Sequence, residues 1–279
     1  MATLYVVATP IGNLGDLTPR ASQILSEADL IGCEDTRRTG TLMQHIGSRA
    51  GRFIVVNEHT ELDAAAEIVD ALNQGHRVAI VSDAGTPAIS DPGSIVVRAA
   101  LTAGHEVVAV PGPSAVVAAL SISGMDSRRF IFEGFLPRDG KERSERIAAV
   151  KQHQYTTVLY EAPHRLLRTI TDLHKALGDT RSVVVIRELT KLHEESWRGS
   201  MAAARAHFES LEPIGEYVIL VDAAPPIPEA TDQMIDNALL NALAEGDSVK
   251  EAANEVAEMF ALPKRNLYER ALRLRGNKP

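Results

Sequence analysis

The sequence of 279 residues contains a single cysteine, Cys33, so no internal disulfide can form and a reducing compartment is expected. No apolar run approaches the roughly 18 residues of a membrane span, and the N-terminal segment lacks the basic n-region of a signal peptide. Excess positive charge is also absent, since the net charge is −8. Binding of nucleic acid through the overall charge of the protein is therefore disfavoured, although the chain can still form a local basic surface. We expect a cytoplasmic protein.

Three further absences narrow the chemistry. No His, Cys and Asp cluster shows metal-ligand spacing, so we predict no metal. No Ser-His-Asp set can be recognised from spacing alone. The glycine-containing loop at residues 82–93 matches neither G-x-G-x-x-G nor a loop ending in G-K-[ST], which excludes the common phosphate-binding loops there.

That loop is nevertheless the most informative segment present. It holds two Gly, two Pro, two Asp and two Ser, residue types that fix turns and let backbone approach a ligand. It follows an apolar run at 77–81 and precedes a predicted helix. Since ligands bind where loops leave the carboxyl ends of strands, we expect a small polar cofactor there. Residues 10–18 and 110–115 form two similar loops after predicted strands, which indicates a shared cleft.

Strands and helices alternate through the first half, which predicts a largely parallel sheet covered on both faces. We expect strands at 4–9, 30–33, 53–57, 77–82 and 106–110, and helices at 19–27, 36–46, 61–74, 94–103 and 114–121. A second series has strands at 130–135, 157–160, 183–187 and 216–221 and helices at 142–153 and 165–177. Residues 182–215 are harder to interpret, and a fifth strand is predicted at 194–199.

A proline-rich segment at 223–228 predicts a linker, beyond which the pattern is entirely helical. Ser248 and Glu251 have capping-box spacing, and 261–263 predicts a turn between two helices that resemble a helix-turn-helix. Residues 261–279 carry six basic residues and one acidic residue, which suits a nucleic-acid partner. We therefore predict an α/β protein of three domains: an N-terminal α/β domain at 1–122, a second α/β domain at 123–224, and a basic helical domain at 230–279.

Carboxylates lie beside basic residues at the ends of several predicted strands. Glu34 and Asp35 precede Arg37, Glu161 precedes Arg165, and residues 187–191 mix both signs. Such groups either pair with one another or face the cleft, where carboxylates can accept protons and basic groups can hold phosphates.

Together these motifs resemble the tetrapyrrole-methylase superfamily of S-adenosylmethionine-dependent methyltransferases, and within it the branch that acts on 16S rRNA. The similarity runs in order from residue 4 to about residue 222, and the helical tail is also similar. It rests on residues 4–16, 34–37, 82–93, 110–115, 132–137, 160–165 and 187–191. Porphyrin-precursor methylases share weaker forms of the glycine loops, whereas Glu-Asp-Thr-Arg and Arg-Glu-Leu-Thr-Lys are more specific to the RNA branch.

The resemblance implies two α/β domains with five-stranded sheets, S-adenosylmethionine in the cleft between them, and a homodimer. The implied activity is 2′-O-methylation of a cytidine ribose in 16S rRNA within the 30S subunit. The implied cofactor contacts are Pro10, Asp83, Ala84, Gly85, Ile89, Ser90, Ser114, Ala115, Phe132, Tyr160 and Glu161.

In that reaction a ribose hydroxyl attacks the sulfonium methyl, so the protein must align both groups and remove or delocalise a proton. Candidate catalytic residues are Asp83, Glu34, Asp35, His59 and Glu161, although positioning alone is a sufficient alternative. Candidate RNA contacts are Arg37, Arg165, Arg187, Lys191, Lys264, Arg265, Arg270 and Arg273. An acidic chain gains little from nonspecific phosphate attraction, which favours a folded 30S precursor over free RNA.

Two other functions remain open. The shared fold allows a tetrapyrrole C-methyltransferase, which has no obvious need for a basic helical appendage. A noncatalytic, cofactor-sensing RNA-binding protein would bind the cofactor without turnover. The fold does not decide among them.

Overall fold

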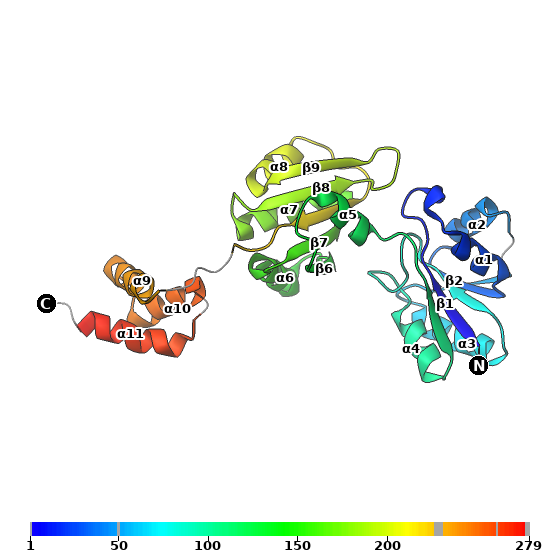
Figure 1. Ribbon diagram of the computed structural model, residues 1–279, viewed down its shortest axis with the longest axis horizontal. Helices are drawn as coiled ribbons and strands as arrows, with labels where there is room; N and C mark the ends of the chain where they lie inside the picture. Colours follow the sequence, from blue (N-terminus) through cyan, green and yellow to red (C-terminus); the bar gives the residue numbers. More distant parts are fainter. Residues whose placement is uncertain (1, 49–50, 226–230, 261, 277–279) are drawn as a thin grey trace. The chain divides into compact units, whose positions relative to one another are not determined.

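The computed structural model describes residues 2–48, 51–225, 231–260 and 262–276 (Figure 1). Contacts divide the chain into two compact units, Met1–Ala224 and Pro225–Pro279. Most of the predicted linker, Ala261 of the predicted turn, and Lys278 lie outside the described residues. Within the described ranges, every helix is too short or too polar to cross a membrane. The division into three domains stays a prediction.

The first sheet of the first unit is parallel throughout, in the order β3-β2-β4-β1-β5. Its central strands are short apolar runs buried on both faces, which is typical of parallel sheets. The strands are β1 (Thr3–Val7), β2 (Leu30–Cys33), β3 (Arg52–Val55), β4 (Val78–Ile80) and β5 (Glu106–Val110).

Helices cover both faces of this sheet, as predicted. The elements of these layers are the 3₁₀ turn η1 (Leu14–Asp16) and the helices α1 (Pro19–Glu27), α2 (Thr36–His45), α3 (Glu61–Asn73) and α4 (Ser94–Thr102). Successive residues of β2 point to opposite layers: Leu30 packs in a cluster with residues of α3 and α4, and Ile31 in a cluster with residues of α1 and α2.

The second sheet is mixed, in the order β6-β7-β10-β8-β9. Only β6 and β7 pair in parallel, with a register shift between Phe132 and Gly134, and the other pairs are antiparallel. The strands are β6 (Phe130–Phe135), β7 (Thr156–Glu161), β8 (Ser182–Arg187), β9 (Glu195–Ser200) and β10 (Tyr217–Val221). The fifth strand predicted at 194–199 is therefore confirmed as β9.

Helices α6 (Gly140–Gln152), α7 (Pro163–Leu177) and α8 (Met201–Glu209) cover one face of the second sheet. Helix α5 (Ala115–Ser123) covers the other face, where its Val116 and Leu120 pack with Val158 and Val218. The boundary predicted after residue 122 thus falls inside a helix that packs on the second sheet. Helix α8 was not predicted; it begins directly after β9, where the Ser200 hydroxyl accepts a hydrogen bond from the Ala203 N–H.

The second unit consists, in its described residues, of α9 (Asp232–Glu245), α10 (Val249–Phe260) and α11 (Lys264–Gly276) around a core of its own. The predicted capping box is confirmed: the Ser248 N–H donates to the Glu251 carboxylate at 2.9 Å, and the Glu251 N–H donates to the Ser248 hydroxyl at 3.3 Å.

Candidate functional site

A pocket of about 480 Å³ lies in the first unit, lined by loops of the first sheet and by strands and loops of the second. Its lining is largely apolar and aromatic, with a few polar groups that include Asp91 and His164. A cavity of this size and character is typical of small-molecule sites.

The structure brings most of the predicted cofactor residues to this pocket. Seven of the eleven line it: Ala84, Gly85, Ile89, Ser114, Ala115, Tyr160 and Glu161. Pro10, Asp83 and Ser90 are each next in sequence to a lining residue, and the Phe132 ring lies edge-on to Tyr160, with centroids 5.0 Å apart. The three loops therefore do share one cavity.

Backbone hydrogen bonds join the loop after β1 to the loop after β4. The Thr9 N–H donates to the Gly85 carbonyl at 2.8 Å, and the Gly85 N–H donates back to Thr9 at 3.1 Å. Gly85 has φ +83°, a left-handed conformation that suits glycine because it lacks a Cβ. These bonds hold residues 84–86, which line the pocket, beside the loop after β1.

The rest of the loop after β4 is fixed by a buried carboxylate that the sequence did not single out. One oxygen of Glu61, on α3, accepts hydrogen bonds from the N–H groups of Gly93 and Ile95, at 2.8 and 2.9 Å. Glu61 is 8% exposed, and it satisfies free N–H groups where α4 begins. Ala88 and Ser90, both with positive φ, lie in the same loop, between the end of β4 and the N–H groups that Glu61 binds.

Four carboxyl groups gather beside the pocket, those of Glu34, Asp35, Asp83 and Asp91. Asp83 accepts a hydrogen bond from the Asp35 N–H at 3.1 Å, and Glu34 accepts one from the Asp83 N–H, also at 3.1 Å. Burial, with the charge of Asp83, raises the pKa of Glu34, whereas hydrogen bonds from Arg37 lower the pKa of Asp35 to about 2. Of these four, only Asp91 lines the pocket.

Asp91 and Glu216 also line the pocket, and neither was among the predicted site residues. Burial, followed by the charge of Glu34, raises the pKa of Asp91 to about 7. Because a strongly shifted carboxyl in a cavity is a marker of functional sites, Asp91 is a stronger candidate than its neighbours. The sequence signal was present in the Ser-Asp-Pro-Gly turn, but nothing in the sequence distinguished its Asp from Asp83.

The remaining two candidate bases lie in different surroundings. Glu161 lines the pocket, but its side chain is buried and accepts hydrogen bonds from Ala162 N–H at 2.9 Å and Thr169 Oγ1 at 2.5 Å. His59 is exposed in the turn before α3, outside the pocket lining, and its N–H donates to Asn57 at 2.9 Å. In the described parts of the chain, no three His, Cys, Asp or Glu side chains could hold a metal ion.

The predicted RNA-binding residues of the first unit differ in how far their charges are engaged. Arg37 is exposed and bonds to Asp35 at 2.7 Å. Arg187 pairs with Glu195 at 3.2 Å, and Lys191 contacts both Glu188 and Glu216 at 2.8 Å. Arg165 is mostly buried; it pairs with Glu161 at 3.2 Å and donates to backbone carbonyls.

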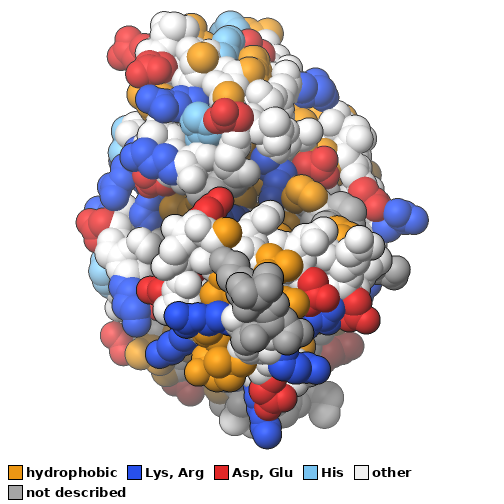
Figure 2. Space-filling view, turned by 90° about the vertical axis from the view of Figure 1, so that its left-hand side faces the viewer, with side chains coloured by type: hydrophobic (Ala, Val, Ile, Leu, Met, Phe, Trp, Pro, Cys, Tyr) orange, Lys and Arg blue, Asp and Glu red, His pale blue; other side chains and the backbone are white. Residues whose placement is uncertain are grey.

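The basic residues of the helical unit fall into two groups. Arg270 donates to Asp232 and Asp236, at 2.6 Å each, so its guanidinium is committed to holding α11 against α9. Lys264 and Arg265 line a hollow of about 250 Å³ between α10 and α11, together with Lys250 and Tyr268. Arg273 lines a second hollow with Arg270. On the face drawn in Figure 2, basic and acidic side chains are interspersed.

Comparison with protein families gives two matches. Residues 3–205 match the model described as Tetrapyrrole (Corrin/Porphyrin) Methylases, and residues 229–275 match the model described as RsmI C-terminal HTH domain. The chain is 43% identical to Ribosomal RNA small subunit methyltransferase I of Synechocystis, over 99% of this chain and 100% of that protein. It is 42% identical to the protein of the same name in Pseudomonas aeruginosa, over 98% of each.

Solved structures share the fold at low sequence identity. The methyltransferase CobJ aligns with a TM-score of 0.62 at 20% identity, covering 80% of this chain and 95% of CobJ. Uroporphyrin-III C-methyltransferase from Thermus thermophilus, in complex with S-adenosylhomocysteine, aligns at 0.56 and 17% identity over 79% of this chain and 97% of that chain. These likenesses show the fold.

Proposed function

The chain belongs to the tetrapyrrole (corrin/porphyrin) methylase family, and on that premise we propose that it uses S-adenosylmethionine to methylate the 2′-oxygen of a cytidine ribose in 16S rRNA. The observation that carries the proposal is the pocket that the predicted loops share. It lies in a chain that aligns over nearly its whole length with proteins named ribosomal RNA small subunit methyltransferase I. The substrate is the ribosomal RNA of an assembling small subunit, which places the enzyme in the cytoplasm.

The residues of the pocket fit S-adenosylmethionine. Its volume of about 480 Å³ suits a ligand of this size, and Gly85 lets main-chain groups approach it closely. Phe135 and Tyr160 offer aromatic surface, with ring centroids 5.6 Å apart, and aromatic faces attract cations. We assign the cofactor contacts to the eleven predicted residues together with Asp91.

When bound, S-adenosylmethionine supplies a methyl group already activated by a positive sulfur. The carboxyl of Asp91 is the group that we assign to balance that charge, because it faces the pocket and ionises near neutral pH. Glu161 is less suited to take a proton, since its oxygens already accept hydrogen bonds. Alignment of the hydroxyl within the pocket is therefore the main contribution of the protein.

For the RNA we favour a group of cations in the helical unit. Lys264, Arg265 and Lys250 line one hollow together with the half-exposed Tyr268. Arg265 also pairs with Glu269 at 3.7 Å, and both side chains of that pair are largely exposed. Cations beside an exposed aromatic ring suit a phosphate chain whose bases can stack. We also propose that the RNA is recognised within the 30S subunit, because a chain of net charge −8 needs the shape of its substrate as well as charge for recognition. Homodimeric assembly is part of the same proposal.

The test is transfer of labelled methyl groups from S-adenosylmethionine to unmodified 30S subunits, free 16S rRNA and a tetrapyrrole precursor in parallel. We expect label on a ribose 2′-oxygen of the 30S subunit. Label on the tetrapyrrole alone would refute the RNA substrate, and cofactor binding without transfer would indicate a sensing protein. A chain truncated after residue 229 should lose RNA methylation while retaining cofactor binding.

A further inference from the structure

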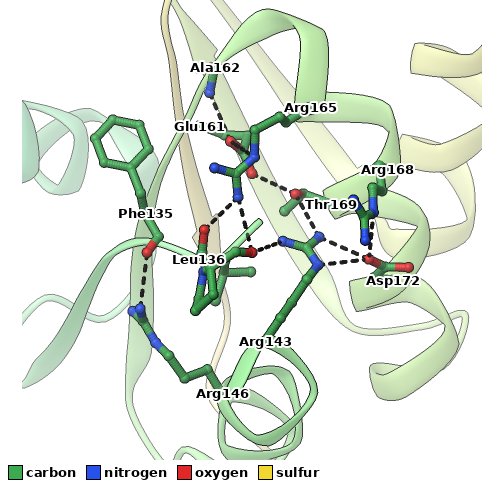
Figure 3. Close-up of polar contacts among 11 residues, drawn as sticks. Phe135, Leu136, Arg143, Arg146, Glu161, Ala162, Arg165, Arg168, Thr169 and Asp172 are labelled. Carbon is green, nitrogen blue, oxygen red and sulfur yellow. Dashed lines mark hydrogen bonds and ion pairs between the residues drawn. The ribbon is translucent and has the colours of Figure 1, made fainter. Parts of the chain in front are cut away.

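Three consecutive carbonyl groups beside the pocket each accept a hydrogen bond from a different arginine (Figure 3). The carbonyl of Phe135 accepts from Arg146 at 3.0 Å, that of Leu136 from Arg165, and that of Pro137 from Arg143 at 2.9 Å. We call these three side chains the arginine clamp. Two of them come from α6 and one from α7, so the clamp draws both helices onto the end of β6.

The hydroxyl of Thr169 links the clamp to the carboxylate at the pocket. It accepts a hydrogen bond from Arg143 at 3.0 Å and donates one to Glu161 at 2.5 Å. Glu161 in turn accepts from the Ala162 N–H and pairs with Arg165, the second arginine of the clamp. Figure 3 shows these side chains converging from β7, α6 and α7.

This network is buried, which makes its composition informative. Arg143 is 4% exposed, Glu161 2% and Thr169 1%. Burying ions costs free energy that pairing often only just recovers, and apolar side chains of similar size are commonly as stabilising. A contribution to stability therefore does not explain why these buried side chains are charged. The need to fix the backbone in one geometry does explain it.

The segments that the network joins are the two that form one side of the pocket. Phe135 lines it at the end of β6, and residues 160–164 line it where β7 passes into α7. We propose that Thr169 is a positioning residue for the cofactor pocket: by fixing Glu161 relative to Arg143, it keeps these two segments at the spacing that the ligand requires. The inference rests on the proposed use of S-adenosylmethionine, and it makes Arg165 a supporting residue instead of an RNA contact.

The first test replaces the hydroxyl groups of two equally buried threonines, Thr169 in α7 and Thr156 at the start of β7. Thr169→Val removes the link, Thr169→Ser retains it, and Thr156→Val is the matched control. Thr156, also 1% exposed, donates to the Asp126 carbonyl at 2.7 Å at the start of β7, outside the pocket lining. We expect Thr169→Val to weaken binding of S-adenosylhomocysteine about tenfold in calorimetry. Thr169→Ser and Thr156→Val should stay within about twofold of the parent.

Melting temperatures separate positioning from general destabilisation. A merely structural role predicts that the two valine variants lose similar stability and that neither changes affinity well below its melting temperature. Equal affinities of Thr169→Val and Thr156→Val would therefore overturn the inference. If the parent chain itself binds no S-adenosylhomocysteine, the proposed cofactor use fails, and with it the premise of this inference.

A second pair keeps the inference testable should Thr169→Val not fold. Arg146 is partly exposed and holds Phe135, whereas Arg128, 88% exposed, pairs with Asp126 at 2.7 Å, and neither residue of that pair lines the pocket. Arg146→Ala should raise the dissociation constant several-fold, and Arg128→Ala should leave it unchanged. Equal constants for both variants would count against the clamp.

Discussion

Thr9 and Gly85 exchange two backbone hydrogen bonds, at 2.8 and 3.1 Å, although they lie 76 residues apart in sequence. This contact joins the first glycine-containing loop to the second and sets Ile11 against Gly85, where both line the pocket. The geometry of the pocket thus depends on main-chain conformation as much as on side chains.

Replacement of Gly85 by alanine should weaken cofactor binding more than it weakens the fold. A non-glycine residue at φ +83° costs about 1–3 kcal/mol, and the loop can relieve that strain only by moving at the pocket. Gly75→Ala is the matched control: its φ is +84°, and an added Cβ would meet nothing within 4 Å. Both variants should lose similar stability in denaturant titrations, and calorimetry should find reduced affinity only for Gly85→Ala.

The charge of Asp91 should make cofactor affinity depend on pH. Because its pKa is about 7, the carboxylate forms as pH rises from 6 to 8, and it then favours the positive sulfonium over the neutral thioether. The preference for S-adenosylmethionine over S-adenosylhomocysteine should grow on the order of tenfold across this range. Asp91→Asn should abolish the change, whereas the exposed Asp70→Asn should not. A parallel pH response of both ligands would contradict this assignment.

The same carboxyl should affect the stability of the free protein in the opposite sense. A folded-state pKa raised above the unfolded value means that the folded chain holds its proton longer, so stability falls as pH rises from about 4 to about 7. Below that window Asp91 is protonated in both states and carries no penalty. Asp91→Asn should therefore melt at a higher temperature than the parent at pH 8, with the difference vanishing near pH 4.

Loss of Lys264 and Arg265 should weaken RNA binding without changing cofactor affinity. Each lost contact to a single-stranded phosphate lowers the slope of log K against log salt by about 0.7, so the double alanine variant should lose about 1.4. Filter binding to 16S rRNA measures this slope. The double variant of Arg20 and Arg98, which are exposed on the first unit, is the control for charge alone. Identical slopes for the two double variants would show that the hollow between α10 and α11 does not bind RNA.

Glu61 should support the pocket loop through its charge and its two hydrogen bonds. Glu61→Ala leaves the N–H groups of Gly93 and Ile95 without this acceptor and should lower the free energy of unfolding by about 2 kcal/mol. Glu61→Gln keeps an acceptor and should lose less. Urea titration gives both values, and the prediction fails if the glutamine variant is the less stable of the two.

The fold was largely predictable because its signals are local. Buried strands such as β2 are short apolar runs, and the helices that cover them show regular spacing. Helix α8 was missed because residues 182–215 were interpreted through strand patterns alone, and the alanine-rich segment after Ser200 has little amphipathic contrast.

The site was predictable at its loops and less so at its charges. Glycine and proline reveal a tight turn from sequence, so the three loops were recognised. The environment of a carboxyl depends on residues far away: Asp91 is shifted by burial and by Glu34, and Glu61 reaches across to a different helix. Likewise nothing near Arg165 in sequence reveals that it points to carbonyls instead of solvent.

The arginine clamp holds carbonyl oxygens, which every amino acid carries, and so it fixes the path of the chain while leaving the side chains there unconstrained. Phe135 is 46% exposed and lines the pocket, yet its own backbone is held by Arg146. A new side chain at this position would reshape the cavity without disturbing its support. Ligand preference at this point can therefore diverge among related enzymes while the scaffold stays the same.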